Sequence, residues 1–162
     1  MLKLFAILAM ALAAVLLVAC DAANLAEIHP GVTTSDQVLQ LMGEPGSRHA
    51  NADGTTTWEY TRQPSGVDCY MISFDGRQIV SRVEQVLSDE YFARVQPGMS
   101  QAEVRRLLGA PGTRRVFARQ QEEIWEWRIR GVPATDETYF SVAFDTGSGL
   151  VKSAAQRVQM RN

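Results

Sequence analysis

The sequence predicts an α+β fold of two tandem repeats, each with two short helices packed on a three- or four-stranded antiparallel sheet. Two observations carry this prediction. A stretch with Pro-Gly near its start and Gly-x-Pro-Gly at its end occurs twice, at Ile28–Gly46 and at Val95–Gly112. After each copy, apolar and polar residues alternate with the period of a β-strand. Helices followed by such strands are typical of helices that cover one face of an antiparallel sheet.

Each copy of the repeated stretch contains the start and the end of one helix. Ser100 and Glu103 have the spacing of a capping box, in which each side chain binds the backbone N–H of the other. Val104, Leu107 and Leu108 then fall on one helical face. The glycine that follows suits a left-handed C-terminal cap, and the proline two residues later cannot continue the helix. The first copy repeats these features with Thr34, Gln37, Val38, Leu41, Met42 and Gly43.

The strands predicted after each helix also match between the repeats. Residues 55–62 align with residues 122–130, which places Trp58 on Trp125 and Glu59 on Glu126. Residues 70–74 align with 140–144, and the last strands are expected at 78–87 and 150–160. Residues 47–51 and 113–118 are candidates for a fourth strand in each repeat. The expected domains are 25–87 for the first repeat and 88–162 for the second.

The amino terminus is predicted to be a secretion signal. Lys3 precedes an apolar run of 16 residues, and Leu17-Val-Ala-Cys20 closes it in a pattern that resembles the bacterial lipobox. Cleavage after residue 19 would leave Cys20 as the first mature residue, acylated and followed by a tether over 20–24. Two or more acyl chains hold a protein stably on a membrane. The alternative is an uncleaved signal anchor in which Cys20 is incidental.

Composition excludes several classes of function. Removal of residues 1–19 leaves 143 residues with 15 basic and 18 acidic side chains, a balance that does not favour nucleic acid. The two histidines, His29 and His49, have no second ligand at a metal-binding spacing. There is no Gly-Lys phosphate loop and no serine with a positioned base, so we expect neither an enzyme nor a cofactor. Cys69 is read as a small buried residue, with an exposed thiol as the alternative.

The second repeat resembles the BamE family, also called SmpA/OmlA lipoproteins. The resemblance rests on Gly98-Met-Ser100, Leu108-Gly-Ala-Pro111, Trp125-Glu-Trp127 and Phe144-Asp145, together with the lipobox. It implies a small periplasmic lipoprotein that associates with the machinery for β-barrel assembly in the outer membrane and acts through protein and lipid contacts. The family's archetype has one such unit. The tandem arrangement is more similar in architecture to the β-lactamase inhibitory protein.

Localisation has two interpretations. The family resemblance implies the outer membrane. Asp21, directly after the acylated cysteine, resembles the enterobacterial signal for retention in the inner membrane. A periplasmic module that binds or inhibits another protein from the inner membrane is therefore the alternative function.

The candidate partner-binding residues are mostly basic. Alternation places Glu126, Arg128 and Arg130 on the strand face opposite Trp125 and Trp127, where solvent is expected. This set is either a solvated face or a contact for acidic headgroups or a protein partner. The tryptophans are expected in the core, and become interface anchors only if a sheet face is left uncovered. The complete set of candidates is Glu126, Arg128, Arg130, Arg105, Arg106, Arg114 and Arg115, with Arg119 beside them.

Overall fold

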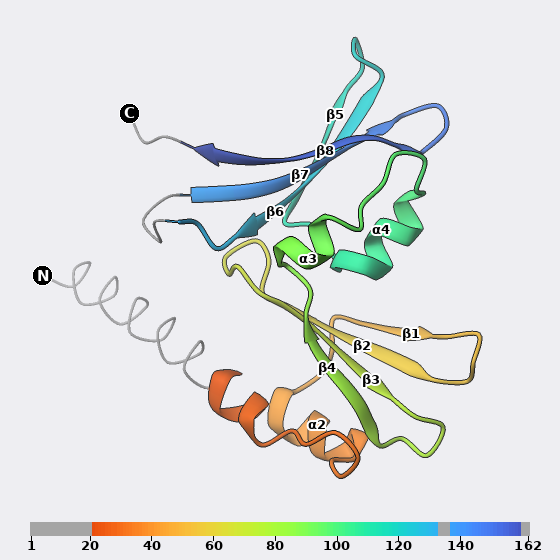
Figure 1. Ribbon diagram of the computed structural model, residues 1–162, viewed down its shortest axis with the longest axis vertical. Helices are drawn as coiled ribbons and strands as arrows, with labels where there is room; N and C mark the ends of the chain where they lie inside the picture. Colours follow the sequence, from red (N-terminus) through yellow and green to blue (C-terminus); the bar gives the residue numbers. More distant parts are fainter. Residues whose placement is uncertain (1–20, 133–136, 160–162) are drawn as a thin grey trace, which may run out of the picture. The chain divides into compact units, whose positions relative to one another are not determined.

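The computed structural model describes residues 21–132 and 137–159, so the predicted signal and the acylation site Cys20 lie outside the described residues. It contains two four-stranded antiparallel sheets with short helices before each (Figure 1). This confirms the predicted α+β fold with two tandem units and a fourth strand in each. The first sheet has the order β1-β2-β3-β4, from Ser47–Ala50, Thr56–Thr61, Cys69–Phe74 and Val80–Gln85. The second has the order β5-β6-β7-β8, from Thr113–Phe117, Glu122–Ile129, Glu137–Asp145 and Val151–Gln159.

The repeated stretch forms helix α2 (Ser35–Met42) in the first copy and α4 (Gln101–Leu108) in the second. Both capping boxes are present, as the sequence predicts. The helices end at Gly43 and Gly109, but neither glycine has the left-handed cap that the sequence indicates. Their φ angles are 75° and 78°, while ψ is −164° and −172°. Only glycine readily adopts this combination of positive φ and extended ψ.

The Pro-Gly turn before each helix is attached to the last strand of its own repeat. The Gly31 N–H donates to the Val80 carbonyl at 2.7 Å, and the Gly98 N–H donates to the Val151 carbonyl at 2.9 Å. The remaining short helices are residues 21–26 and α3 (Asp89–Phe92), which begins after Ser88 as expected. The repeated stretch therefore serves to dock a helix and a strand together.

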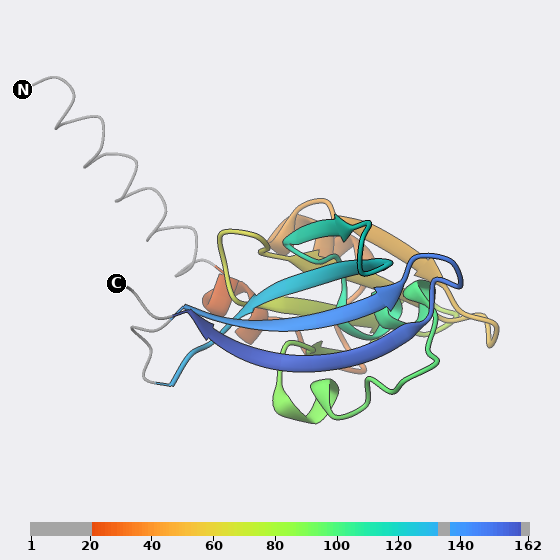
Figure 2. The same ribbon diagram turned by 90° about the horizontal axis from the view of Figure 1, so that it is seen from above.

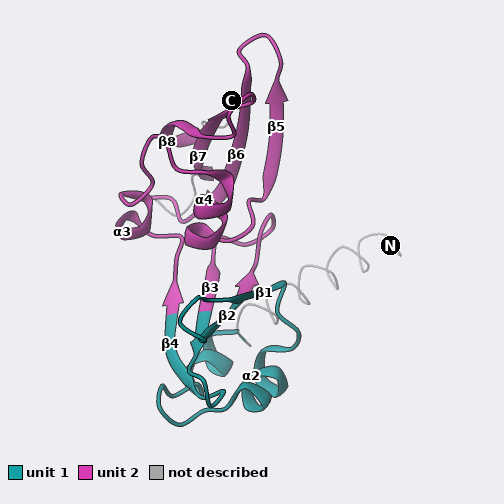
Figure 3. Ribbon diagram, turned by 90° about the vertical axis from the view of Figure 1, so that its right-hand side faces the viewer, with its two compact units in different colours: residues 1–58, 72–83 teal, residues 59–71, 84–162 magenta. Residues whose placement is uncertain are grey.

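The chain divides into two compact units (Figure 3). The first contains residues 21–58 and 72–83. Its core includes Val38 of α2, and the rings of Trp58 and Phe74 lie 4.5 Å apart. The second contains residues 59–71 and 84–159, so it takes in the end of β2, the loop that follows it and the start of β3.

The core of the second unit lies between its sheet and the helices α3 and α4, which lie along one face of that sheet (Figure 1). Trp125 pairs with Val142 across β6 and β7, and Trp127 pairs with Phe140. These residues are buried with Val104 and Leu108 of α4, which confirms that the tryptophans belong to the core. The Phe92 ring of α3 stacks on Phe140 at 4.2 Å.

Cys69 is fully buried in the same core, as the sequence predicts. Burial, helped by the neighbouring Glu59 carboxylate, raises the pKa of the Cys69 thiol to about 12. The thiol is therefore protonated at neutral pH and acts as a small apolar group.

None of the helices in the described part of the chain has the length and apolar character needed to cross a membrane.

Candidate protein-binding face of the second sheet

The second sheet has one face covered by helices and one that α3 and α4 do not cover, called here the outer face. Strand alternation places Trp125 and Trp127 toward the helices and Glu126 on the outer face. Neighbouring strands supply the residues paired with Glu126, which are Thr113 of β5 and Ser141 of β7. The predicted division of β6 into two faces is confirmed.

Glu126 is buried, although the sequence predicts that it lies in solvent. Its side chain is 7% exposed because two arginine side chains, from β5 and β8, cover it. Arg115 of β5 binds one carboxylate oxygen. Arg157 of β8 donates to the other at 2.7 Å, and the Ser141 hydroxyl lies 3.3 Å from it. The Thr113 hydroxyl lies 3.3 Å from the oxygen that Arg115 binds.

The environment of Glu126 favours its charged form. Burial raises the pKa of the carboxyl, but the hydrogen bonds and charges of Arg157 and Arg115 outweigh this effect, so the pKa lies below its usual value. A buried carboxylate with several donors is satisfied, which makes this cluster a fixed feature of the outer face.

Glu126→Gln is expected to change how stability depends on pH. Because the folded pKa is lowered, the carboxylate contributes stability above its unfolded pKa of about 4.3, and this contribution is lost as pH falls through the folded pKa. Measured by urea unfolding, the free energy of unfolding should therefore be larger for wild type than for Glu126→Gln at neutral pH. This difference should shrink as the pH is lowered. Glu44→Gln is the control, since Glu44 also pairs with an arginine but its side chain is 75% exposed. A difference that stayed constant into acid would contradict the assignment.

A shallow hollow of about 270 Å³ lies beside this cluster. It is lined by Arg115, Phe117, Ile124, Glu126 and Arg157. The side chains of Arg115 and Arg157 are 57% and 47% exposed. A guanidinium has five N–H donors, so each arginine that binds Glu126 can also donate to a partner. Phe117, 38% exposed, adds an apolar ring at the edge of the hollow.

Two of the predicted binding arginines make contacts within the second unit. Arg105 of α4 binds the Glu59 carboxylate, whose side chain is 1% exposed and which also accepts from the Ala110 N–H at 3.0 Å. Arg114 lies on the helix side of the sheet, where its guanidinium stacks 4.2 Å from the Trp125 ring. Arg106, by contrast, is exposed on α4.

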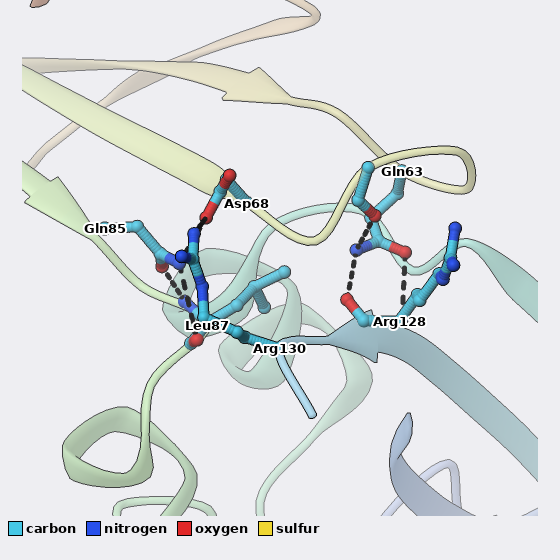
Figure 4. A network of polar contacts seen from close by, with 7 residues as sticks. Gln63, Asp68, Gln85, Leu87, Arg128 and Arg130 are labelled. Atoms are coloured by element: carbon cyan, nitrogen blue, oxygen red, sulfur yellow. Dashed lines mark hydrogen bonds and ion pairs between the residues drawn. The ribbon is translucent and has the colours of Figure 1, made fainter. Parts of the chain in front are cut away.

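Arg128 and Arg130 hold the β2–β3 loop against the end of β6 (Figure 4). The Gln63 side-chain amide donates to the Arg128 carbonyl at 2.7 Å and accepts from the Arg128 N–H at 3.0 Å. The Arg128 guanidinium donates to the Ser65 carbonyl at 3.0 Å. Arg130 lies 3.5 Å from the Asp68 carboxylate, to which Gln85 also donates.

The structure thus brings together only part of the predicted set. Glu126 and Arg115 share one cluster, and sequence reasoning missed its third member, Arg157. Strand alternation in β8 could have placed Arg157 on the outer face. This signal was weak, because the other residues on that face of the strand include Ser153 and Ala155, which do not suggest a binding site. Within residues 21–132 and 137–159, no three His, Cys, Asp or Glu side chains form a group suited to a metal ion.

A family model described as the outer membrane protein assembly factor BamE domain matches this chain twice, at residues 19–84 and 84–153. No curated protein matches the sequence. Two solved structures are similar to the chain. One is a candidate β-lactamase inhibitor protein from Streptococcus mutans, with 14% identity, 77% of this chain and 82% of that chain covered, and a TM-score of 0.34. The other is a DUF4309 family protein (YjgB) from Bacillus subtilis subsp. subtilis strain 168. It has 12% identity, with 82% of this chain and 83% of that chain covered, and a TM-score of 0.32.

Proposed function

Because this chain belongs to the BamE domain family, we propose that it is a non-catalytic, protein-binding lipoprotein of the outer membrane protein assembly type. The single observation that carries the binding role is the outer face of the second sheet, where the hollow beside Glu126 combines exposed arginine donors with an exposed aromatic ring. Arginine and aromatic side chains are the residues that most often dominate protein interfaces.

The charges of this cluster favour a partner that supplies acceptors. One carboxylate faces two guanidinium groups, so the cluster of Glu126, Arg115 and Arg157 has a net positive charge. The carboxylate fixes the orientation of both arginines before a partner arrives, which lowers the entropy lost on binding. A partner with backbone carbonyls or acidic side chains over the hollow would complete the remaining hydrogen bonds.

The membrane attachment is proposed to be acylated Cys20. Family membership supports a periplasmic lipoprotein, and the lipobox supplies the attachment point. Family membership supports the outer membrane as the location, while Asp21 favours the inner membrane and the alternative role of an inhibitor-like module. Fractionation of membranes separates the two, because recovery in the inner membrane alone would contradict a role in outer-membrane assembly.

Photocrosslinking from position 117 in the full-length protein in cells tests the binding face. We expect a crosslinker in place of Phe117 to capture a component of the β-barrel assembly machinery. Position 116 is the matched control. Val116 is 66% exposed and adjacent on the same strand, but alternation turns it to the other face. Capture from position 116 and none from 117 would overturn the assignment of the outer face.

A substitution at position 117 tests how much the Phe117 side chain contributes to partner binding. In a chain without the crosslinker, Phe117→Glu should lower the affinity for the captured partner about tenfold, since an interface anchor costs at least about 1.4 kcal/mol when lost. Val116→Glu should leave that affinity unchanged. Because both side chains are exposed in the folded chain, neither change should lower stability by more than about 0.5 kcal/mol.

A further inference from the structure

We propose that the free edge of β8 binds an extended polypeptide segment of a partner as an added strand, and that a pocket on the helix side receives one apolar side chain of that segment. This site differs from the outer face in its backbone edge and in its pocket. It therefore goes beyond the proposed function and does not require the outer face to bind.

β8 is an edge strand whose Gln156 side chain donates to Asp89 of α3 at 2.7 Å, while its backbone edge stays unpaired within the described chain beyond Val151. It pairs with β7 on one side only (Figure 2). All residues from 152 to 159 are exposed, on both faces of the strand. Within the described residues, the backbone hydrogen bonds on its free side stop at Val151, which pairs with Gly98 and Met99. From Lys152 onward the edge offers backbone donors and acceptors that match another strand.

The other edge of this sheet is less suited to pairing. β5 has five residues and carries two adjacent arginines, Arg114 and Arg115. β8 has nine residues, and the centre of the strand is Ser153-Ala-Ala-Gln156. Short length and charge are the usual means by which proteins protect an edge. β8 is longer than β5, and its two charges, Lys152 and Arg157, lie five residues apart with an uncharged segment between them.

A pocket of about 450 Å³ lies on the helix side of β8. Gln156 and Val158 line it from β8, and Leu87, Phe92 and Ile129 supply buried apolar surface. Exposed apolar surface comes from Val158, which is 50% exposed, and Val132, which is 95% exposed, and polar groups come from Gln85, Ser88, Asp89 and Arg130. A strand added beside β8 would place every second side chain on this side of the sheet.

One polar group in the pocket lacks a partner. Thr138 is 6% exposed, and its hydroxyl makes no hydrogen bond among the residues that the structure describes. The residue lies between Ile129 and Val158 in the sheet and lines the same pocket. A buried hydroxyl without a partner is destabilising, and in this pocket it stands where apolar surface would contact the partner's apolar side chain.

The charge of β8 restricts which polypeptide segments can pair with it. The strand carries Lys152 and Arg157 and no acidic residue. Like charges directly opposite one another destabilise a strand pair, whereas opposite charges stabilise it. The expected segment is extended, has apolar residues at alternate positions and carries acidic rather than basic residues between them.

Hydrogen exchange of the full-length protein tests the proposal with a synthetic peptide as long as β8, in which valine alternates with threonine and glutamate. At saturation the peptide should slow exchange of the β8 amides at least about tenfold. The same peptide N-methylated at every residue has no backbone N–H to donate, cannot form the strand ladder and should give no protection. Absence of protection, or equal protection by the methylated peptide, would overturn the proposal.

Three variants separate this site from its alternatives. Val158→Glu should weaken peptide binding about tenfold, and Arg115→Ala on the outer face should leave it unchanged. Thr138→Val should lower neither binding of the valine peptide nor stability, because it replaces an unpartnered hydroxyl by a methyl group of the same shape in a pocket that receives an apolar side chain. If the β8 amides are protected without peptide and lose that protection on dilution, the edge pairs with a second copy and the proposal is wrong. Crosslinking from position 117 reports on the outer face separately.

Discussion

Gly109→Ala is expected to lower the free energy of unfolding by about 4 kcal/mol, the sum of a backbone and a packing cost. The backbone cost arises because Gly109 has a φ of 78° with an extended ψ, which an alanine adopts only under strain. The packing cost arises because an added Cβ would lie 2.5 Å from the Cys69 sulfur and 3.3 Å from the Glu59 carboxyl carbon. Both neighbours are buried, so neither moves aside easily.

The first repeat provides a matched control in Gly43→Ala. Gly43 ends α2 as Gly109 ends α4 and has nearly the same backbone angles, but an added Cβ there meets nothing within 4 Å. Gly43→Ala should lower the free energy of unfolding by the backbone cost alone, about 2 kcal/mol. Urea unfolding followed by tryptophan fluorescence measures both. Equal losses at the two positions would contradict the packing argument.

A second substitution isolates the contact with the sulfur. Cys69→Ala removes the nearest obstacle to a Cβ at position 109. The double variant should therefore lose less stability than the sum of the two single variants, by about 1 kcal/mol. Strict additivity would show that the crowding at Cys69 is not the cause.

Arg105→Ala is expected to lower the free energy of unfolding by about 3 kcal/mol, because it removes the ion-pair partner of a buried carboxylate. Glu59 has a side chain that is 1% exposed, and the Arg105 side chain is itself 24% exposed. The Ala110 N–H still donates to the carboxylate in the variant, but the charge of Arg105 is gone. Equilibrium unfolding at neutral pH measures the loss.

Arg106→Ala is the control for Arg105→Ala. Arg106 is the next residue on α4 and is exposed, so its loss should change stability by less than about 0.5 kcal/mol. Adding Glu59→Gln to Arg105→Ala should recover part of the stability, since a neutral amide costs less to bury than an unpaired charge. If it recovers none, the loss comes from the packing of the arginine stem.

The location of the charged side chains shows where prediction from sequence stops. Alternation predicts that Glu126 lies opposite the core tryptophans, and this is correct. It predicts solvent around Glu126, and this is wrong, because Arg115 and Arg157 come from two other strands to cover it. Arg105 binds a carboxylate 46 positions earlier in the chain, a pairing that no local pattern encodes.

The sequence by itself determined the helices, the strands and their duplication. Capping boxes, helix-stopping glycines and two-residue alternation act over a few residues, so Thr34 with Gln37 and Ser100 with Glu103 specify their helices locally. Family membership follows from the same signals. Only the tertiary structure decided which charges are buried, which arginines remain on the outer face and that β8 keeps a free edge beside a pocket. These properties depend on which distant segments pack together. Side-chain contacts between residues 31 or 65 positions apart produce no periodic pattern in the sequence.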